Sequence, residues 1–135
     1  MRRRAVRRAS APFALDRVGQ VAIRVRDLDR AVAFYRDKLG MKFLFRVPNM
    51  AFVQCGDLTL LLGLPEDPGR DHPSSLIYFA VPDIDAAFRT LLERGVEAHG
   101  SPHLVHRAPD HELWMAFFQD ADDNPLALMG RKPPR

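Results

Sequence analysis

The chain has 135 residues, of which 47% are hydrophobic, and a formal net charge of +3. This length and composition are typical of one compact domain with a sizeable core. No apolar run approaches the roughly 18 residues of a membrane span, and the single cysteine excludes an internal disulfide and a cysteine-based zinc site. We therefore expect a cytoplasmic protein without a membrane partner.

The positive charge lies at the two ends of the chain. Residues 1–17 hold six arginines and one aspartate, and residues 131–135 hold three basic residues, whereas the body from 18 to 130 has 11 basic and 16 acidic residues. A basic arm can bind nucleic acid by counterion release, but no nucleic-acid-binding module accompanies it. We predict a disordered leader over 1–17, a tail over 131–135, and no nucleic-acid partner.

The first predicted module spans residues 18–63. Apolar and polar residues alternate from 18 to 26, which predicts a strand with one face toward the core. Asp27 is a good N-cap for the amphipathic helix that follows, and Gly40 is the expected C-cap. Three short apolar runs separated by turn dipeptides complete the module, and they predict strands over 41–46, 50–55 and 58–63.

The same order of elements recurs over residues 75–130, after a proline-rich linker at 64–74. Val81 aligns with Val25 at an offset of 56 residues (81 − 25), and this alignment places Asp83 on Asp27. The second module should therefore be β-α-β-β-β like the first. Its predicted elements are a strand over 76–81, a helix over 84–94 ended by Gly95, and strands over 96–107, 113–119 and 126–130.

Three sequence features carry a resemblance to a known family. They are the Val-x-Asp-[Leu/Ile]-Asp junction in each module, the run Ala33-Phe-Tyr-Arg-Asp-Lys-Leu-Gly40, and the run Phe117-Phe-Gln-Asp-Ala-Asp-Asp-Asn-Pro-Leu-Ala127. Over about residues 18–130 the chain resembles the glyoxalase / bleomycin-resistance / extradiol dioxygenase superfamily, also called vicinal oxygen chelate proteins. The resemblance implies an α+β fold in which two tandem βαβββ modules form a curved mixed sheet around a cleft, with the helices on the outer face. We also expect a homodimer.

The resemblance also implies where a divalent metal would bind in the cleft. Each module of the family is expected to offer one ligand from its first strand and one from its last strand, which here are Gln20, Leu60, Leu76 and Ala127. Only Gln20 has a donor atom, because leucine and alanine have none. A register shift of one residue would bring in Thr59 or Ser75, which are poor ligands. We expect no metal or other cofactor, with a divalent metal on non-standard ligands as the alternative.

Five side chains are predicted to contact a ligand in the cleft. Gln20 and Arg24 share one strand face, and a guanidinium there can bind a carboxylate or phosphate; in glyoxalases an arginine at this position contacts the acidic end of the substrate. Tyr78 can offer a hydroxyl group, while Met115 and Phe117 can form an apolar wall. The alternative is structural, because the polar groups could face water and the apolar groups could simply fill the cleft.

His103, His106 and His111 cluster near the start of the predicted strand over 113–119. The spacing of His103 and His106 does not fit one strand face, where residues i and i+2 align. A solvated histidine-rich loop is therefore weighed against a relocated metal site. His111 is the candidate catalytic base among the three, because it is expected at the mouth of the cleft.

These observations predict a small-molecule-binding protein of the glyoxalase / bleomycin-resistance kind, which binds a partly apolar anionic compound without the usual metal site. The alternative is an enzyme, either a glyoxalase I-like lyase or isomerase or a dioxygenase-type enzyme, with a divalent metal on non-standard ligands or with His111 as its base. A third possibility is a structural or regulatory module. One scaffold hosts all of these activities, so the fold alone does not choose among them.

Overall fold

The computed structural model describes residues 13–65 and 73–135. The greater part of the predicted leader and the middle of the predicted linker lie outside the described residues. The first module consists of β1 (Gln20–Arg24), α2 (Leu28–Ala33), η1 (Phe34–Lys38), β2 (Lys42–Val47), β3 (Met50–Cys55) and β4 (Leu58–Gly63). The second consists of β5 (Ile77–Ala80), α3 (Ile84–Glu93), β6 (Ala98–Ala108), β7 (His111–Gln119) and β8 (Pro125–Lys132).

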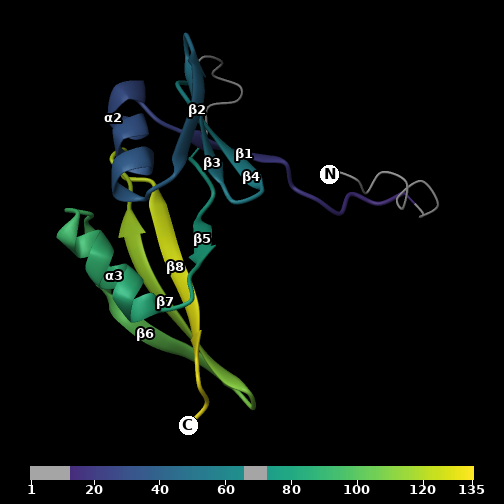
Figure 1. Ribbon diagram of the computed structural model, residues 1–135, viewed down its shortest axis with the longest axis vertical. Helices are drawn as coiled ribbons and strands as arrows, with labels where there is room; N and C mark the ends of the chain where they lie inside the picture. The colour runs from purple at the N-terminus through teal and green to yellow at the C-terminus, as the bar shows by residue number, and fades with distance from the viewer. Residues whose placement is uncertain (1–12, 66–72) are drawn as a thin grey trace.

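Each module builds its own four-stranded mixed sheet, and the two strand orders are the same. The orders are β1-β4-β3-β2 and β5-β8-β7-β6, with the first and last strands of each module parallel and the other neighbours antiparallel. The two sheets are stacked end to end, and α2 and α3 cover them on the same side of the molecule (Figure 1). The predicted α+β class and the two tandem βαβββ modules are confirmed, with the sheet present as two four-stranded halves.

The helices begin as the aspartates predict. The Asp27 side chain accepts a hydrogen bond from the Arg30 backbone N–H, and Asp83 does the same for Ala86, so each carboxylate satisfies a donor at the start of its helix. The first helix differs from the prediction because it widens into the π-helical turn η1. This turn brings Phe34 and Tyr35, two consecutive residues, into the core together.

One hydrophobic core runs through both modules. It joins Ile23 of β1 and Val25, the residue after this strand, with buried side chains of α3 and β8 such as Ile84 and Leu128. On β1 the alternation predicted from the sequence is present, because Ile23 is buried whereas Gln20 is exposed. Within residues 13–65 and 73–135, no helix has the length and apolar character needed to cross a bilayer.

A buried polar contact fastens the second module to the first. The Tyr35 hydroxyl donates to Asp120 Oδ2 at 2.7 Å, and Asp120 also accepts from the backbone N–H groups of Asp122 and Asn124. The Asn124 side-chain amide donates to the Arg24 carbonyl at 2.8 Å. Burial, with the Asp120 carboxylate as a second cause, raises the pKa of the Tyr35 phenol far above its ordinary value. These hydrogen bonds therefore hold the turn between β7 and β8 against the end of β1 and the first helix.

Candidate functional site

Each sheet has one face packed on its helix and a second face that we call the open face. On the first sheet the parallel register sets Gln20 beside Thr59 and Ala22 beside Leu61. Gln20 and Ala22 are exposed, so this row faces away from the helix. Leu60 lies on the other face and is 2% exposed, packed in the core.

The strand pairing corrects one of the positions inferred from the sequence. Tyr78 pairs with Ala127 on the second sheet, and its equivalent Ala22 pairs with Leu61 on the first. The position equivalent to Ala127 is therefore Leu61, not Leu60. The pairing at the strand ends agrees: Gly63 pairs with Arg24, and Met129 pairs with Ala80, the equivalent of Arg24. Leu61 also lacks a donor atom, so Gln20 is still the one residue with a metal-coordinating atom among the four positions.

An aromatic group occupies the open face of the second sheet. Tyr78, Ala127 and Phe117 form one row across β5, β8 and β7. The rings of Tyr78 and Phe117 meet edge to face with their centroids 6.1 Å apart, and Ala127 between them is fully buried. The His103 ring stacks on Phe117 at 5.9 Å. This aromatic group covers the position from which the last strand would offer a metal ligand.

The five predicted ligand contacts fall into two groups on two sheets. Tyr78, Phe117 and Met115 belong to the second sheet, where Met115 lies beside Met129 on the open face. Gln20 and Arg24 stand on the first sheet at the two ends of β1, about 13 Å apart along the strand. The Arg24 backbone N–H donates to Ser74 Oγ at 2.8 Å, which ties the end of β1 to the chain leading into β5.

The histidines lie on a β-hairpin and not in the loop considered from the sequence. β6 and β7 pair on either side of a two-residue turn, and the register shifts between Leu104 and His106. His103 therefore pairs with Met115 and His106 with Leu113, two residues of one β7 face. The shift places both histidines on the open face, contrary to the prediction from their spacing. A bulge of this kind has no clear signal in the sequence.

His111 stands apart from the aromatic group. It is the first residue of β7, six residues and about 20 Å along the strand from Phe117. Its Nδ1 lies 2.8 Å from Asp110 Oδ1, and the hydrogen bond from His111 holds the pKa of the Asp110 carboxyl below its usual range. His103, rather than the predicted base His111, is the histidine whose ring contacts a predicted ligand residue, Phe117.

The donor set at the inferred metal positions does not fit a divalent ion. Gln20, Leu61, Leu76 and Ala127 offer one amide oxygen, and Thr59 adds a hydroxyl group beside Gln20. Across the described ranges no three histidine, cysteine or carboxylate side chains converge closely enough to hold a metal ion. The open faces are instead suited to stacking, apolar contact and hydrogen bonding.

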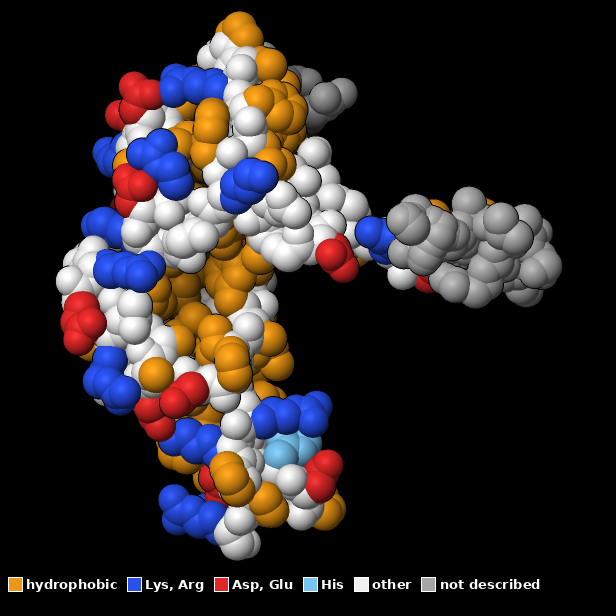
Figure 2. Space-filling model, in the orientation of Figure 1, with side chains coloured by type: hydrophobic (Ala, Val, Ile, Leu, Met, Phe, Trp, Pro, Cys, Tyr) orange, Lys and Arg blue, Asp and Glu red, His pale blue; other side chains and the backbone are white. Residues whose placement is uncertain are grey.

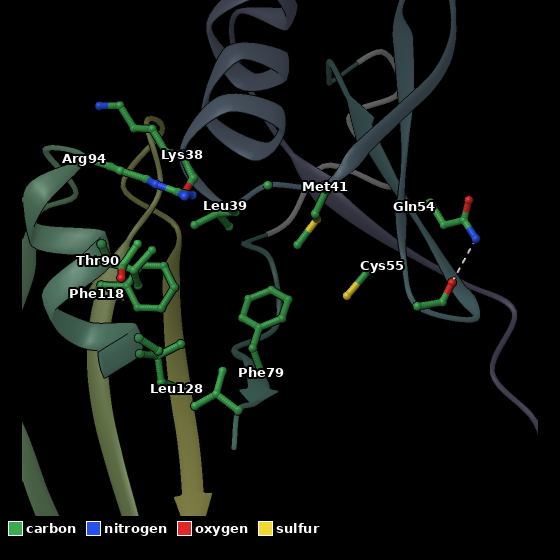
Figure 3. Close-up of a pocket in the computed structure, with 15 residues that line it drawn as sticks. Lys38, Leu39, Met41, Gln54, Cys55, Phe79, Thr90, Arg94, Phe118 and Leu128 are labelled. Carbon is green, nitrogen blue, oxygen red and sulfur yellow. Dashed lines mark hydrogen bonds between the residues drawn. The ribbon is translucent and has the colours of Figure 1, made fainter. Parts of the chain in front are cut away.

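A separate pocket of about 430 Å³ lies between the two modules, on the side of the helices. Apolar side chains line the hollow between the modules (Figure 2). Met41 and Cys55 direct their sulfur atoms into it from the first module, opposite Phe118 and Leu128 of the second (Figure 3). Burial raises the pKa of the Cys55 thiol. No residue that the sequence predicted to bind a ligand lines this pocket.

Comparison with known proteins agrees with the architecture. Residues 17–128 match the sequence profile of the "Glyoxalase/Bleomycin resistance protein/Dioxygenase superfamily". The Bacillus subtilis (strain 168) protein YraH is 28% identical over 126 residues, which cover 81% of this chain and 94% of YraH.

Solved structures give the same result. A member of the same superfamily from Sphaerobacter thermophilus is 30% identical, with a TM-score of 0.66 over 86% of this chain and 98% of that one. A lactoylglutathione lyase from Agrobacterium tumefaciens is 23% identical, with a TM-score of 0.66 over 84% of this chain and 92% of the lyase. The second likeness concerns the fold alone.

Proposed function

Because this chain belongs to the glyoxalase/bleomycin resistance protein/dioxygenase superfamily, we propose that it binds a partly apolar, anionic small molecule on the open faces of its sheets, without a divalent metal. The observation that carries the proposal is the row Tyr78–Ala127–Phe117. Two aromatic rings there cover a position from which a metal ligand would project. An aromatic surface stands where a metal-coordinating atom would be needed. The ligand is therefore held by stacking and apolar contact instead of by coordination to a metal.

The apolar part of the ligand stacks on the aromatic group. Tyr78 is 42% exposed, so its ring is half available to a ligand while its edge contact with Phe117 holds it in place. Aromatic pairs in such geometry contribute about 0.5–1.5 kcal/mol beyond the area that they bury. His103 extends the group by one ring and can also donate or accept a hydrogen bond.

The anionic part of the ligand is assigned to the first sheet. Arg24 and Gln20 lie on its open face, and a guanidinium offers paired N–H donors that match a carboxylate or phosphate. The Arg24 backbone is held between Ser74 and Asn124 by two hydrogen bonds of 2.8 Å each. A fixed backbone lowers the entropy cost of presenting this side chain to a ligand.

Binding of 2-naphthoate, an anionic aromatic probe, tests the proposal by calorimetry. Phe117→Ala should weaken binding about tenfold, because one stacking surface is lost. Leu92→Ala is the matched control, since Leu92 is an exposed apolar residue on α3, and it should leave the affinity unchanged. Equal affinities for Phe117→Ala and the unsubstituted protein would contradict the stacking site.

The metal-free part of the proposal has its own test. Protein purified without chelator should contain no stoichiometric Ni²⁺, Zn²⁺, Mn²⁺ or Fe²⁺ by elemental analysis, and these ions should not raise its melting temperature. An equimolar ion that disappears in Gln20→Ala would refute the proposal. It would favour the alternative of a lyase, isomerase or dioxygenase with a metal on non-standard ligands.

His103 favours a second candidate function, a metal-free enzyme of the glyoxalase type. Its imidazole lies on the open face against Phe117 and could transfer a proton to or from a bound ligand. His111 is less suitable, because it stands at the hairpin turn beside Asp110. Proton exchange at an acidic carbon of a bound ligand, followed by NMR in D₂O, should be lost in His103→Gln and retained in His111→Gln if this candidate is right.

A homodimer is proposed on the strength of β2. Every residue of this edge strand is exposed, including Phe43, Leu44 and Phe45, and an exposed apolar edge strand is a surface that proteins ordinarily cover. A second copy can cover it through a two-fold contact that repeats the same strand. Light scattering coupled to size exclusion should give twice the chain mass of 15.3 kDa, and Phe45→Lys should shift the protein toward the monomer.

A further inference from the structure

The pocket between the modules marks a place where the internal duplication has diverged. Leu91 is the equivalent of Tyr35 at the offset of 56 residues between the helices (91 − 35). Cys55 is the equivalent of Asp120, because Cys55 follows Gln54 on β3 as Asp120 follows Gln119 on β7. Tyr35 and Asp120 form a buried hydrogen bond at one side of the contact between modules. Leu91 and Cys55 stand at the opposite side.

Leu91 and Cys55 fill less space than Tyr35 and Asp120 do at the equivalent positions. Leucine is shorter than tyrosine, and a thiol cannot replace a carboxylate as a strong acceptor. Leu91 and Cys55 both line the pocket of about 430 Å³. Gln54, next to Cys55, turns away and donates to the Gly56 carbonyl at 3.0 Å (Figure 3). The module contact is therefore filled by a hydrogen-bonded pair at one side and hollow at the other.

The chemistry of the walls indicates what could enter. Phe79, Phe118, Leu128, Met41 and Leu91 make the walls apolar. The charged lining residues are Lys38 and Arg94, with no carboxylate among the lining side chains. Arg94 Nη1 donates to the Lys38 carbonyl at 2.9 Å, which holds the guanidinium at the edge of the pocket (Figure 3). A volume of this size is within the range of small-molecule sites, roughly 300–1,000 Å³.

We propose that this pocket is a second binding site, which takes an apolar monocarboxylate such as a medium-chain fatty acid. The alkyl chain lies between Phe79 and Leu128, where it replaces water against apolar walls. The carboxylate lies at the edge of the pocket beside Arg94, whose remaining N–H groups can donate to it. The site is separate from the open faces and does not depend on the ligand proposed for them.

Cys55 provides a reporter inside the pocket, because it is the single cysteine of the chain. Iodoacetamide alkylation at pH 8.5, followed by intact mass, should slow several-fold when decanoate is added below its micelle concentration. Decanol, the neutral analogue, should also protect but at higher concentration, since it cannot pair with Arg94. An alkylation rate that decanoate leaves unchanged would overturn the proposal.

Two variants separate this site from the open faces. Leu91→Tyr restores the bulk that Tyr35 has in the other helix, and it should weaken decanoate binding at least tenfold in calorimetry. Leu92→Tyr is the matched control on the exposed neighbour and should bind decanoate normally. If Leu91→Tyr does not fold, Ala87→Leu fills the same pocket from α3 and should give the same loss. Normal decanoate binding by the folded filling variant would refute the site.

The charge at the edge of the pocket is tested on its own. Arg94→Gln should weaken decanoate binding about tenfold, the effect expected for one charge-assisted hydrogen bond, and should leave the affinity for decanol unchanged. Arg94→Lys should restore part of the decanoate affinity. Phe117→Ala should not alter decanoate binding. If Phe117→Ala abolishes it while Leu91→Tyr does not, decanoate occupies the open face and the pocket proposal fails.

Discussion

The two sides of the contact between the modules differ in how a duplicated pair of positions is used. On one side Tyr35 and Asp120 are joined by a buried hydrogen bond of 2.7 Å. On the other side Leu91 and Cys55 border an open pocket. A leucine and a thiol cannot reproduce the hydrogen bond of a phenol with a carboxylate, and space remains between the modules where they lie. A diverged copy of a structural contact is therefore a natural place for a ligand site to arise.

The largest effect is expected from Asp120→Ala. This carboxylate accepts four hydrogen bonds, from Tyr35, the backbone of Asp122 and Asn124, and the Asn124 side chain. Their loss in a buried turn should lower the free energy of unfolding by about 3–5 kcal/mol in urea titrations. Cys55→Ala, the equivalent change at the pocket side, should cost about 1 kcal/mol. Equal losses would contradict the asymmetry between the two sides.

Tyr35→Phe tests one hydrogen bond between the modules, the one from Tyr35 to Asp120. It removes the hydroxyl and leaves the ring, so the free energy of unfolding should fall by about 1–3 kcal/mol, the range for a broken buried hydrogen bond. Urea unfolding measures the change. Tyr78→Phe is the control, because Tyr78 lies on the open face and its hydroxyl has no such buried partner to lose. An equally large fall in the free energy of unfolding for Tyr78→Phe would show that the Tyr35 hydrogen bond does not stabilise the fold more than an exposed hydroxyl does.

The same tyrosine should make stability fall at high pH. The folded state raises the pKa of Tyr35 far above its ordinary value, so stability is fully present below the pKa of the unfolded phenol, about 10. Above that pH the unfolded state releases a proton that the folded state keeps. Each further pH unit should then cost about 1.4 kcal/mol. Unfolding curves at pH 9, 10 and 11 should show this fall in the free energy of unfolding. In Tyr35→Phe the loss per pH unit above pH 10 should be smaller by the amount due to one proton, about 1.4 kcal/mol.

The smallest effect is expected from filling the hollow side. Leu91→Phe should change the free energy of unfolding by less than about 1 kcal/mol in either direction, since the added atoms enter existing space. Leu62→Phe is the matched control, because Leu62 is fully buried in the core, and overpacking there should cost about 1–3 kcal/mol. Comparable costs for the two variants would mean that the pocket does not accept added side-chain volume.

Much of the fold could be read from local chemistry. The strand alternation that ends at Val25, the caps at Asp27 and Asp83, and the positive-φ glycines Gly40 and Gly95 depend on residues close in sequence. The duplication then gave the order of elements in both modules. The facing of Met115 and Phe117 follows from strand parity, which depends only on the alternation of side chains.

The site was less predictable because it depends on pairing between distant segments. The choice between Leu60 and Leu61 needs the register of β4 against β1, and a slip of one residue moves a side chain to the opposite face. The shared face of His103 and His106 needs a register shift within the β6–β7 hairpin. Neither feature is specified by any short stretch of sequence.

The amino-acid sequence by itself determined two βαβββ modules and a donor-poor set of metal positions, because caps, alternation and side-chain chemistry are local properties. The tertiary structure decided which residues meet. It stacked His103 on Phe117 and set Tyr78 edge to face against the same ring. It also closed one side of the module contact with Tyr35 and Asp120 and left a pocket at Leu91 and Cys55. These outcomes depend on how two packed modules share one core, which is a property of the whole chain.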